Sequence, residues 1–232
     1  MLALAFRASI AGALFSFIPL LVVTTADAAP SDGPEQKRIE QAYANRMQVE
    51  QEKARNQLIL GKTTALLNDP ATPVIGNPQA DVAIIEFFDY TCPYCKAVEP
   101  RLERLLKDDK RVKLVVKEFP ILTPESLVAS KVALAAVKQG KYEQFHNILM
   151  NFKGRLTNDV IFETAKDVGL DVARLRKDMD APEITNEIIA NFNLARGLRI
   201  FQTPAFIVDG QLLTGESADI DFPKVVAAAR AK

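Results

Sequence analysis

The sequence predicts an α/β fold in which a central sheet starts with a parallel pair of strands, is interrupted by helices and ends with a hairpin. Three observations predict it. Two short apolar runs flank an amphipathic helical stretch, which is the order of a β-α-β unit. Several helical segments then follow with no strand between them. Two further short apolar runs joined by a turn, and a last helix, complete the chain.

Length and charge limit the classes of function. The 232 residues suffice for one domain with a sizeable core, or for one domain with an appendage. Lys+Arg and Asp+Glu number 29 each, which gives no electrostatic reason to expect nucleic acid as a partner. The two Cys and one His exclude a zinc site built from four Cys or His ligands of this chain.

Residues 1–28 have the pattern of a cleaved signal peptide. Arg7 precedes an apolar stretch from Ala11 to Val23, and Ala26-Asp27-Ala28 supplies small residues for cleavage. A membrane anchor is the alternative, but the apolar stretch is broken by Pro19 and is shorter than the roughly 20 residues of a spanning helix. We therefore expect no stable membrane insertion. We expect export to the periplasm, where disulfides form and persist.

Residues 29–66 are predicted to form an N-terminal helical extension. The stretch from Ser31 to Gly61 is rich in Glu, Gln, Lys and Arg. Its apolar residues form one thin stripe: Ile39, Tyr43, Met47, Ala54 and Leu58. Because a helix so poor in apolar residues buries little by itself, it would be either a solvated appendage or an oligomerisation stalk whose partner supplies the missing surface. The pattern leaves both open.

The first strands follow an irregular lead-in between Asn68 and Pro78, which is rich in turn residues. Asp81 to Asp89 is an almost continuous apolar run interrupted by Glu86, which indicates a strand buried on both faces. Pro93 to Leu106 has helical periodicity, and Val112 to Val116 is typical of a second strand. The helix between them favours a parallel pair.

A helical insertion is predicted at about 122–198, within a compact domain of residues 67–232. Thr123-Pro124-Glu125 supplies an N-cap, a proline at the first helical position and an acid in the first turn. Further helices are expected at Lys141 to Phe152, Asn158 to Val168, Asp171 to Met179 and Glu183 to Gly197. The hairpin and last helix are expected at Ala205 to Val208, Leu212 to Leu213 and Asp221 to Arg230.

Cys92-Pro93-Tyr94-Cys95 lies between the first strand and its helix. At a helix N-terminus the dipole and the free N–H groups stabilise an anion, so Cys92 should ionise below the usual pKa of about 8.5 and act as a nucleophile. Cys95 lies one turn further on, within reach of Cys92 and of a mixed disulfide formed there. These residues favour a redox-active dithiol.

Three other uses of the Cys pair compete with the redox dithiol. A structural disulfide would close a very short loop and would add little stability. Haem attachment needs a His after the second Cys, where Lys96 stands. A Cu(I) or Zn site stays open, with ligands borrowed from another subunit.

These residues resemble a known family. The strand-ending Phe87-Phe88-Asp89-Tyr90-Thr91, the Cys motif, the helical block and Thr203-Pro204-Ala205 resemble a DsbA-like thiol-disulfide oxidoreductase of the thioredoxin superfamily. The polar extension makes the chain most similar to the ScsC-like and Com1-like subgroup. The resemblance covers residues 67–232 and implies a thioredoxin-like fold with an inserted helical domain. It further implies client proteins with thiols or disulfides, a redox partner that recycles the dithiol, a homo-oligomer, specifically a trimer, and no cofactor or metal.

The resemblance also assigns individual residues. Thr203 and Pro204 match the family's cis-proline loop, which lies beside the active-site sulfurs and offers backbone groups to an extended substrate. With Pro93 and Tyr94 they form the expected substrate-binding set. From the residues alone, Thr203-Pro204 predicts only a turn, because a cis X-Pro bond is uncommon.

Four ionisable residues were singled out. Glu86, six residues before the motif, matches the family's buried acid. A carboxyl inside an apolar strand should also have a raised pKa and would relay the proton of the second Cys; a purely structural Glu is the alternative. Glu99 and Lys117 match charged positions that the family places near the site. We interpret His146, the one His, as structural.

We therefore expect an exported thiol-disulfide oxidoreductase that forms or isomerises disulfides in client proteins. Cys92 would form the mixed disulfide and Cys95 would resolve it. Oxidation, isomerisation and reduction use the same residues, so the direction stays open. The alternative from a different class is a non-catalytic copper-binding or partner-binding protein, with the Cys pair as ligands and residues 31–61 as an assembly helix.

Overall fold

The structure is a computed structural model that describes residues 33–214 and 220–231. It confirms the predicted fold class, a mixed α/β fold with a helical insertion and an N-terminal helical segment. The predicted signal peptide lies outside the described residues. Across the described ranges, no helix is both long enough and apolar enough to cross a membrane.

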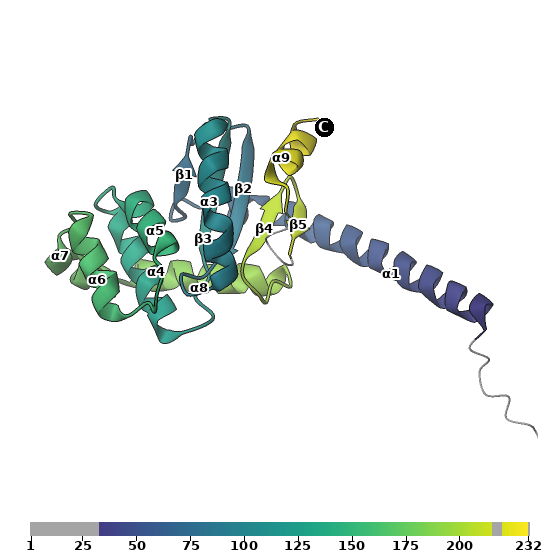
Figure 1. Ribbon diagram of the computed structural model, residues 1–232, viewed down its shortest axis with the longest axis horizontal. Helices are drawn as coiled ribbons and strands as arrows, with labels where there is room; N and C mark the ends of the chain where they lie inside the picture. The colour runs from purple at the N-terminus through teal and green to yellow at the C-terminus, as the bar shows by residue number, and fades with distance from the viewer. Residues whose placement is uncertain (1–32, 215–219, 232) are drawn as a thin grey trace, which may run out of the picture. The chain divides into compact units, whose positions relative to one another are not determined.

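One five-stranded sheet forms the centre of the fold (Figure 1). Its strands stand in the order β1-β3-β2-β4-β5. They are β1 (Val74–Gly76), β2 (Val82–Phe88), β3 (Val112–Glu118), β4 (Ala205–Val208) and β5 (Gln211–Leu213). β2 and β3 pair in parallel and are joined by α3 (Pro93–Asp108), as predicted. The other pairings are antiparallel, so β4 and β5 form the expected hairpin.

The helical insertion lies between β3 and β4. It comprises α4 (Pro124–Val137), α5 (Tyr142–Asn151), α6 (Asn158–Asp167), α7 (Val172–Asp178) and α8 (Pro182–Gly197). The side chains of Thr123, Thr157 and Asp171 cap the first turns of α4, α6 and α7, which explains where these helices begin. The last helix, α9 (Phe222–Arg230), follows the hairpin.

The two faces of the sheet bury different cores, because successive side chains of a strand point to opposite faces. Ile84 and Phe88 face the larger core, which also contains both cysteines and the buried residues of the insertion. Ile85 and Phe87 face the second core, where the end of α8 packs. Since Glu86 alternates with Ile85 and Phe87, its carboxyl points to the cysteine side.

The lead-in to the sheet was predicted to be irregular throughout, and this was wrong for Val74–Gly76. These residues form β1, which pairs antiparallel with β3 and places Val74 opposite Val115. Only Ile75 of the three is buried, so the strand is held by backbone hydrogen bonds rather than by an apolar pattern that the sequence would reveal. β3 also runs two residues beyond the predicted end, to Glu118.

The N-terminal segment is α1 (Pro34–Gly61), followed by the short α2 (Thr63–Leu67). The chain divides into two compact units after Arg46. In the first unit, the described residues of α1 are exposed. In the second, Ile59 and Leu66 are buried in the second core. The predicted limits of the extension, residues 29 and 66, remain a prediction.

Candidate active site

The dithiol lies at the junction between the end of β2 and the start of α3. Cys92 is the N-cap of α3 and Pro93 follows at its first position, as expected for a residue without an N–H. The turn is closed by the Cys92 N–H, which donates to the Asp89 carbonyl at 3.0 Å. Both Cys92 and Cys95 are free and buried, with 3% and 0% of their surface exposed.

The pKa of Cys92 is lowered to about 6, which agrees in direction with the sequence prediction. The largest cause is the side chain of Cys95, followed by that of Thr203 and by the backbone N–H groups of Cys95 and Tyr94, while burial opposes them. As a thiol, Cys92 donates to the Thr203 carbonyl at 3.3 Å. The Thr203 hydroxyl is buried and has no other hydrogen-bond partner among the described residues, so it is free to donate to the thiolate.

The structure brings the predicted substrate-binding residues to the same place. The Thr203-Pro204 peptide bond is cis, and it immediately precedes β4, whose residue Ala205 pairs with Phe87 of β2. Pro204 is buried, whereas Tyr94 is 58% exposed. Thr203 and Pro204 therefore lie in a loop that contacts the Cys92 sulfur, and Tyr94 of the same Cys motif presents an exposed ring.

Glu86 is fully buried on the cysteine side of the sheet, close enough for its charge to act on both Cys92 and Cys95. Neither of its carboxyl oxygens has a hydrogen-bond partner within the described part of the chain. Burial, and then the charges of Glu99, Cys92 and Glu118, raise the pKa of Glu86 well above its usual value. Burial, the Cys92 side chain and the Glu86 charge likewise raise the pKa of Cys95. The site thus pairs an ionised outer sulfur with a protonated inner one.

A buried polar cluster that the sequence analysis did not assemble lies on the same side of the sheet. Glu118 accepts hydrogen bonds from Tyr142 at 2.7 Å and from Tyr90 at 3.2 Å. The Tyr90 hydroxyl is 3.1 Å from Nδ1 of His146, whose Nε2 is 3.7 Å from Glu99. Burial raises the pKa of Glu118 to about 7, although Ser130 and Tyr142 act to lower it. His146 is therefore a buried member of a polar network that adjoins the site.

One signal in the sequence could have found Glu118. The parallel register places it opposite Phe88, so Glu118 at the end of β3 and Asp89, which follows β2, come to the same edge of the sheet. A carboxyl directly after an apolar parallel strand is a standard indication of a site at that edge.

Asp89 organises the turn that carries Cys92. One carboxylate oxygen accepts hydrogen bonds from the Thr91 N–H at 2.7 Å, the Thr91 hydroxyl at 2.8 Å and the Ser126 hydroxyl at 2.6 Å. The other accepts from the N–H groups of Ile121 and Leu122 at 2.9 and 3.0 Å. Asp89 is fully buried. It therefore ties the active-site turn to the start of the helical insertion.

Lys117 does not join the site, although the resemblance suggested it. It stands opposite Phe87 in the register and so faces the second core, away from the cysteines. Its ammonium group donates to the Ala65 carbonyl at 3.0 Å and to the Thr72 hydroxyl. Glu99, by contrast, is buried at 2% exposure beside His146. Strand alternation explains the position of Lys117, because it places Lys117 and its neighbour Glu118 on opposite faces of the sheet, and only Glu118 faces the cysteine side.

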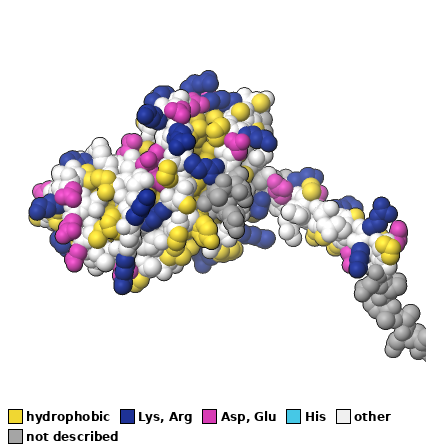
Figure 2. Space-filling view, in the orientation of Figure 1, with side chains coloured by type: hydrophobic (Ala, Val, Ile, Leu, Met, Phe, Trp, Pro, Cys, Tyr) yellow, Lys and Arg dark blue, Asp and Glu magenta, His cyan; other side chains and the backbone are white. Residues whose placement is uncertain are grey.

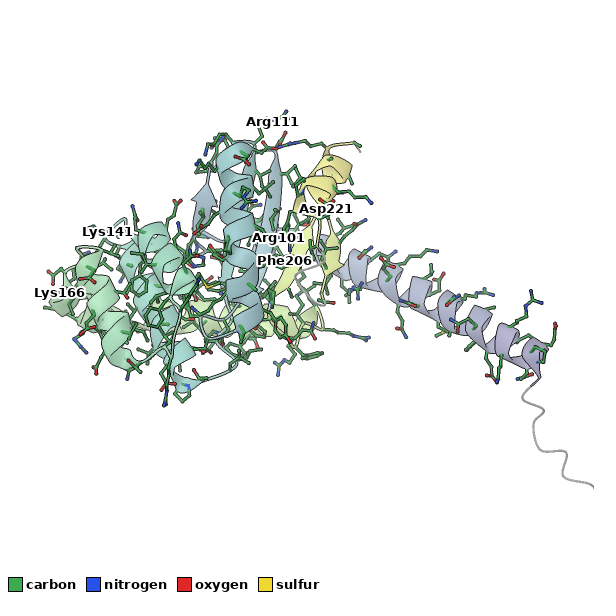
Figure 3. The ribbon with its side chains drawn as sticks, viewed as in Figure 1. Arg101, Arg111, Lys141, Lys166, Phe206 and Asp221 are labelled. Carbon is green, nitrogen blue, oxygen red and sulfur yellow. The ribbon has the colours of Figure 1, made fainter. Side chains whose placement is uncertain are left out.

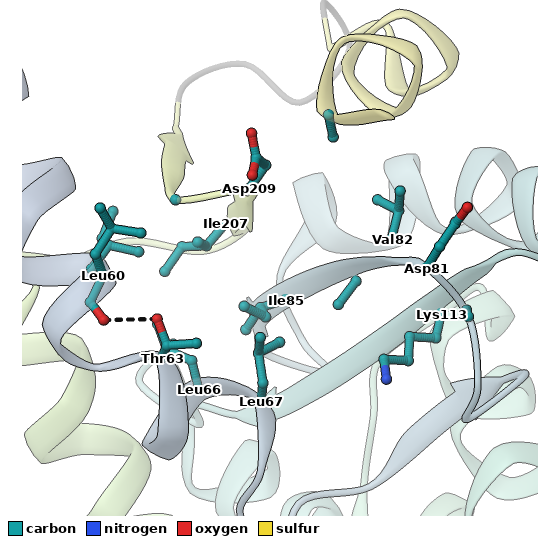
Figure 4. A pocket seen from close by; sticks show the side chains of 15 residues that line it. Leu60, Thr63, Leu66, Leu67, Asp81, Val82, Ile85, Lys113, Ile207 and Asp209 are labelled. Carbon is teal, nitrogen blue, oxygen red and sulfur yellow. Dashed lines mark hydrogen bonds between the residues drawn. The ribbon is translucent and has the colours of Figure 1, made fainter. Parts of the chain in front are cut away.

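A pocket on the second face of the sheet is remote from this chemistry. Leu60, Thr63 and Ile207 are among the residues that line it, and the Thr63 hydroxyl donates to the Leu60 carbonyl at 2.7 Å (Figure 4). The described residues contain no group of three His, Cys, Asp or Glu side chains that could hold a metal ion. A metal bound by Cys92 and Cys95 would need further ligands from outside the described part of this chain.

Comparison with known proteins identifies the family. The model of the DSBA-like thioredoxin domain matches residues 83–222, a range that holds the dithiol, the insertion and the cis-proline loop. The chain belongs to this family. The DsbA-like resemblance read from the sequence is confirmed, and so is the similarity to ScsC-type proteins.

Two solved structures and two curated relatives illustrate the similarity. A thioredoxin-like oxidoreductase from Silicibacter pomeroyi is 42% identical, with a TM-score of 0.69 over 73% of this chain and 98% of that chain. The catalytic domain of Proteus mirabilis ScsC is 28% identical, with a TM-score of 0.68 over 76% of this chain and 99% of that one. A Rickettsia typhi protein named as a protein-disulfide oxidoreductase is 28% identical over 156 residues, which cover 63% of this chain. The chain spans 57% of that relative's length. A Na(+)/H(+) antiporter of Salinispora tropica is 27% identical over 68% of this chain, and the chain spans 25% of the antiporter's length.

Proposed function

We propose that the chain is an exported thiol-disulfide oxidoreductase that forms or isomerises disulfides in client proteins. The observation that carries the proposal is the asymmetric pair at the start of α3: Cys92 has a pKa of about 6, while the pKa of the buried Cys95 is raised. An outer thiolate and an inner thiol are what a two-step exchange through a mixed disulfide requires.

The steps follow from this geometry. For isomerisation, the Cys92 thiolate attacks a client disulfide, forms a mixed disulfide and releases a client thiolate. That thiolate attacks another client disulfide and releases a different client thiolate. The new thiolate then attacks the mixed disulfide and displaces Cys92 as a thiolate, so the client's disulfides are rearranged with no net oxidation. For oxidation, a client thiolate attacks the Cys92–Cys95 disulfide and releases the Cys95 thiolate. A second client thiolate then displaces Cys92, and two electrons remain on the dithiol until a redox partner removes them.

Three further roles complete the proposal. Glu86 takes up and returns the proton of Cys95, for which its burial and raised pKa support it. Pro204 and the backbone of Thr203 bind the client chain beside the sulfurs, and Pro93 and Tyr94 border the same place. Neither a metal nor an organic cofactor takes part in these steps.

The direction of exchange is proposed to be oxidation or isomerisation rather than reduction. A thiolate with a pKa of about 6 stabilises the reduced dithiol, which makes the disulfide a better oxidant. Isomerisation would gain from a homo-oligomer, because several reduced sites would then face one misfolded client. The exposed apolar residues of α1, among them Ile39 at 56% and Tyr43 at 66%, support the oligomerisation stalk. The signal-peptide pattern supports a periplasmic location.

Refolding of a scrambled protein with several disulfides tests the proposal. The mature chain would be compared with a version that lacks residues 29–46, a cut that leaves the buried Ile59 in place, and with Cys92→Ser. We expect exchange in the first two and none in the third. If the mature chain is oligomeric by light scattering and unscrambles, while the shortened chain is monomeric and only oxidises, the isomerase form is supported. Retained turnover in Cys92→Ser would contradict the proposal. Stoichiometric Cu(I) binding by the mature chain, without any disulfide exchange, would favour the metal-binding alternative.

A further inference from the structure

A cleft of about 570 Å³ lies beside the dithiol, and of its lining residues only Pro93 has a role in the proposal above. One wall comes from the turn before α3 and from α3 itself: Thr91, Pro93, Lys96 and Pro100. The other wall comes from the start of α4 and from residues 150–156, which comprise the end of α5 and the segment after it. Thr91 and Pro93 flank Cys92 in the sequence, so a chain bonded to the Cys92 sulfur has the cleft within its immediate reach.

The cleft combines an apolar lining with unpaired positive charge. Met150 and Leu156 are buried and Phe152 is half-buried, so these side chains offer an apolar surface. Lys153 and Arg155 are exposed, and neither has an ion pair or a side-chain hydrogen bond within the part of the chain that the structure describes.

A third cation is fixed within the cleft. The Lys96 ammonium group donates to the carbonyls of Leu149 and Met150, which holds the end of α5 against α3. Glu125 is the one acidic side chain in the lining, against three basic ones. This local excess stands out in a chain whose total charge is balanced, and whose visible face in Figure 2 intersperses basic and acidic side chains.

We propose that this cleft is a client subsite, which takes an extended protein segment with an acidic side chain close to the reacting cysteine. The inference rests on the proposed exchange at Cys92. A protein segment fits better than a free anion, because the apolar lining needs apolar groups of the same ligand and Pro93 places that ligand beside the sulfur. Since exposed ion pairs add little affinity but speed encounter, the subsite acts chiefly on the rate of mixed-disulfide formation and makes it salt-dependent.

A pair of peptide substrates tests the subsite. Both carry one cysteine in a mixed disulfide with a coloured thiol, and they differ only in two Glu residues beside the cysteine, which are Gln in the second peptide. Reduced full-length protein would be compared with Lys153→Glu/Arg155→Glu. The matched control is Lys166→Glu/Lys177→Glu, which makes the same charge change at exposed positions of α6 and α7 that do not line the cleft. Figure 3 labels Lys166.

We expect the unaltered protein to react about three to ten times faster with the Glu peptide than with the Gln peptide at low salt, and the difference to fade at high salt. Lys153→Glu/Arg155→Glu should lose or reverse this preference while it keeps its rate with the Gln peptide, and the control should retain it. Equal rates for the two peptides in the unaltered protein, or an equal loss in the control, would overturn the inference. A preference for glutathione disulfide over neutral small disulfides, with no discrimination between the peptides, would also overturn it. Failure of both peptides to react would instead count against the proposed function.

Discussion

Replacing Asp89 tests how the active-site turn is held. Asp89→Asn leaves one oxygen as an acceptor and turns the other into an NH₂ group. The N–H groups of Ile121 and Leu122, which now donate to the second oxygen, would then face a donor. Each is part-buried, so losing its partner costs about 1 to 2 kcal/mol, the lower half of the range for buried groups. The expected loss is about 2 to 4 kcal/mol, out of a total of about 5 to 15 for an ordinary domain.

Urea unfolding followed by far-ultraviolet circular dichroism measures this loss, since the chain has no Trp. Asp81→Asn is the matched control, because Asp81 forms exposed ion pairs with Arg230 and Arg111, and solvent screening leaves such pairs little effect on stability. Ser126→Ala removes one donor to Asp89 together with the acceptor for the Thr123 N–H, and should cost about 1 to 2 kcal/mol. If Asp89→Asn unfolds at the same urea concentration as Asp81→Asn, the reasoning about this carboxylate is refuted.

The remaining predictions concern the ionisation of the site and its consequences. The thiolate absorbance of the reduced protein at 240 nm should titrate near pH 6, so that at pH 7 Cys92 is ionised in about ten molecules for each one that is protonated. Thr203→Val should raise the pH of this titration, because it removes a hydroxyl that stabilises the thiolate. An unchanged titration in that variant would contradict the role of the hydroxyl. Because the pKa of Cys92 is lowered on folding, its contribution to the stability of the reduced protein should be complete above about pH 9 and should be lost as the pH falls through about 6, which urea unfolding at several pH values checks. The raised pKa of Glu86 gives the opposite pH dependence of stability. Its contribution to folding is complete below the ordinary carboxyl pKa, where the group is protonated in both states, and is lost as the pH rises. Glu86→Leu should therefore gain stability relative to the unaltered protein as the pH rises from 5 to 9, and a gain independent of pH would count against a buried ionising carboxyl. The same variant should resolve mixed disulfides more slowly, which stopped-flow mixing with a labelled client peptide measures.

The sequence allowed most of the fold to be predicted because its signals were local. The apolar run of β2 and the caps of α4, α6 and α7 depend on neighbouring residues, so periodicity and turn chemistry reveal them. β1 could not be predicted because its three residues are held by pairing with β3. A pairing partner about forty residues away produces no pattern in the sequence around β1. The same distinction explains the error in placing Lys117, whose face is fixed by the register of the strands.

The candidate site divides in a similar way. Cys92 and Cys95 could be predicted because a dithiol at a strand-to-helix junction carries its chemistry in four adjacent residues. Glu118 comes from β3, whereas Tyr142 and His146 come from α5, and only the fold brings the two elements together. The role of Asp89 also depends on donors from the loop after β3 and from α4, which no spacing in the sequence discloses.

Trapping of the mixed disulfide tests the central claim most directly. The account predicts that Cys95→Ser accumulates a stable adduct between Cys92 and a client peptide, identified by mass spectrometry after digestion, because the thiol that resolves it is absent. Under the same conditions Cys92→Ser should form no adduct, since the pKa of the buried Cys95 is raised and its thiol is not ionised at neutral pH. An adduct on Cys95 in Cys92→Ser, or the absence of any adduct in Cys95→Ser, would contradict the assignment of the two sulfurs.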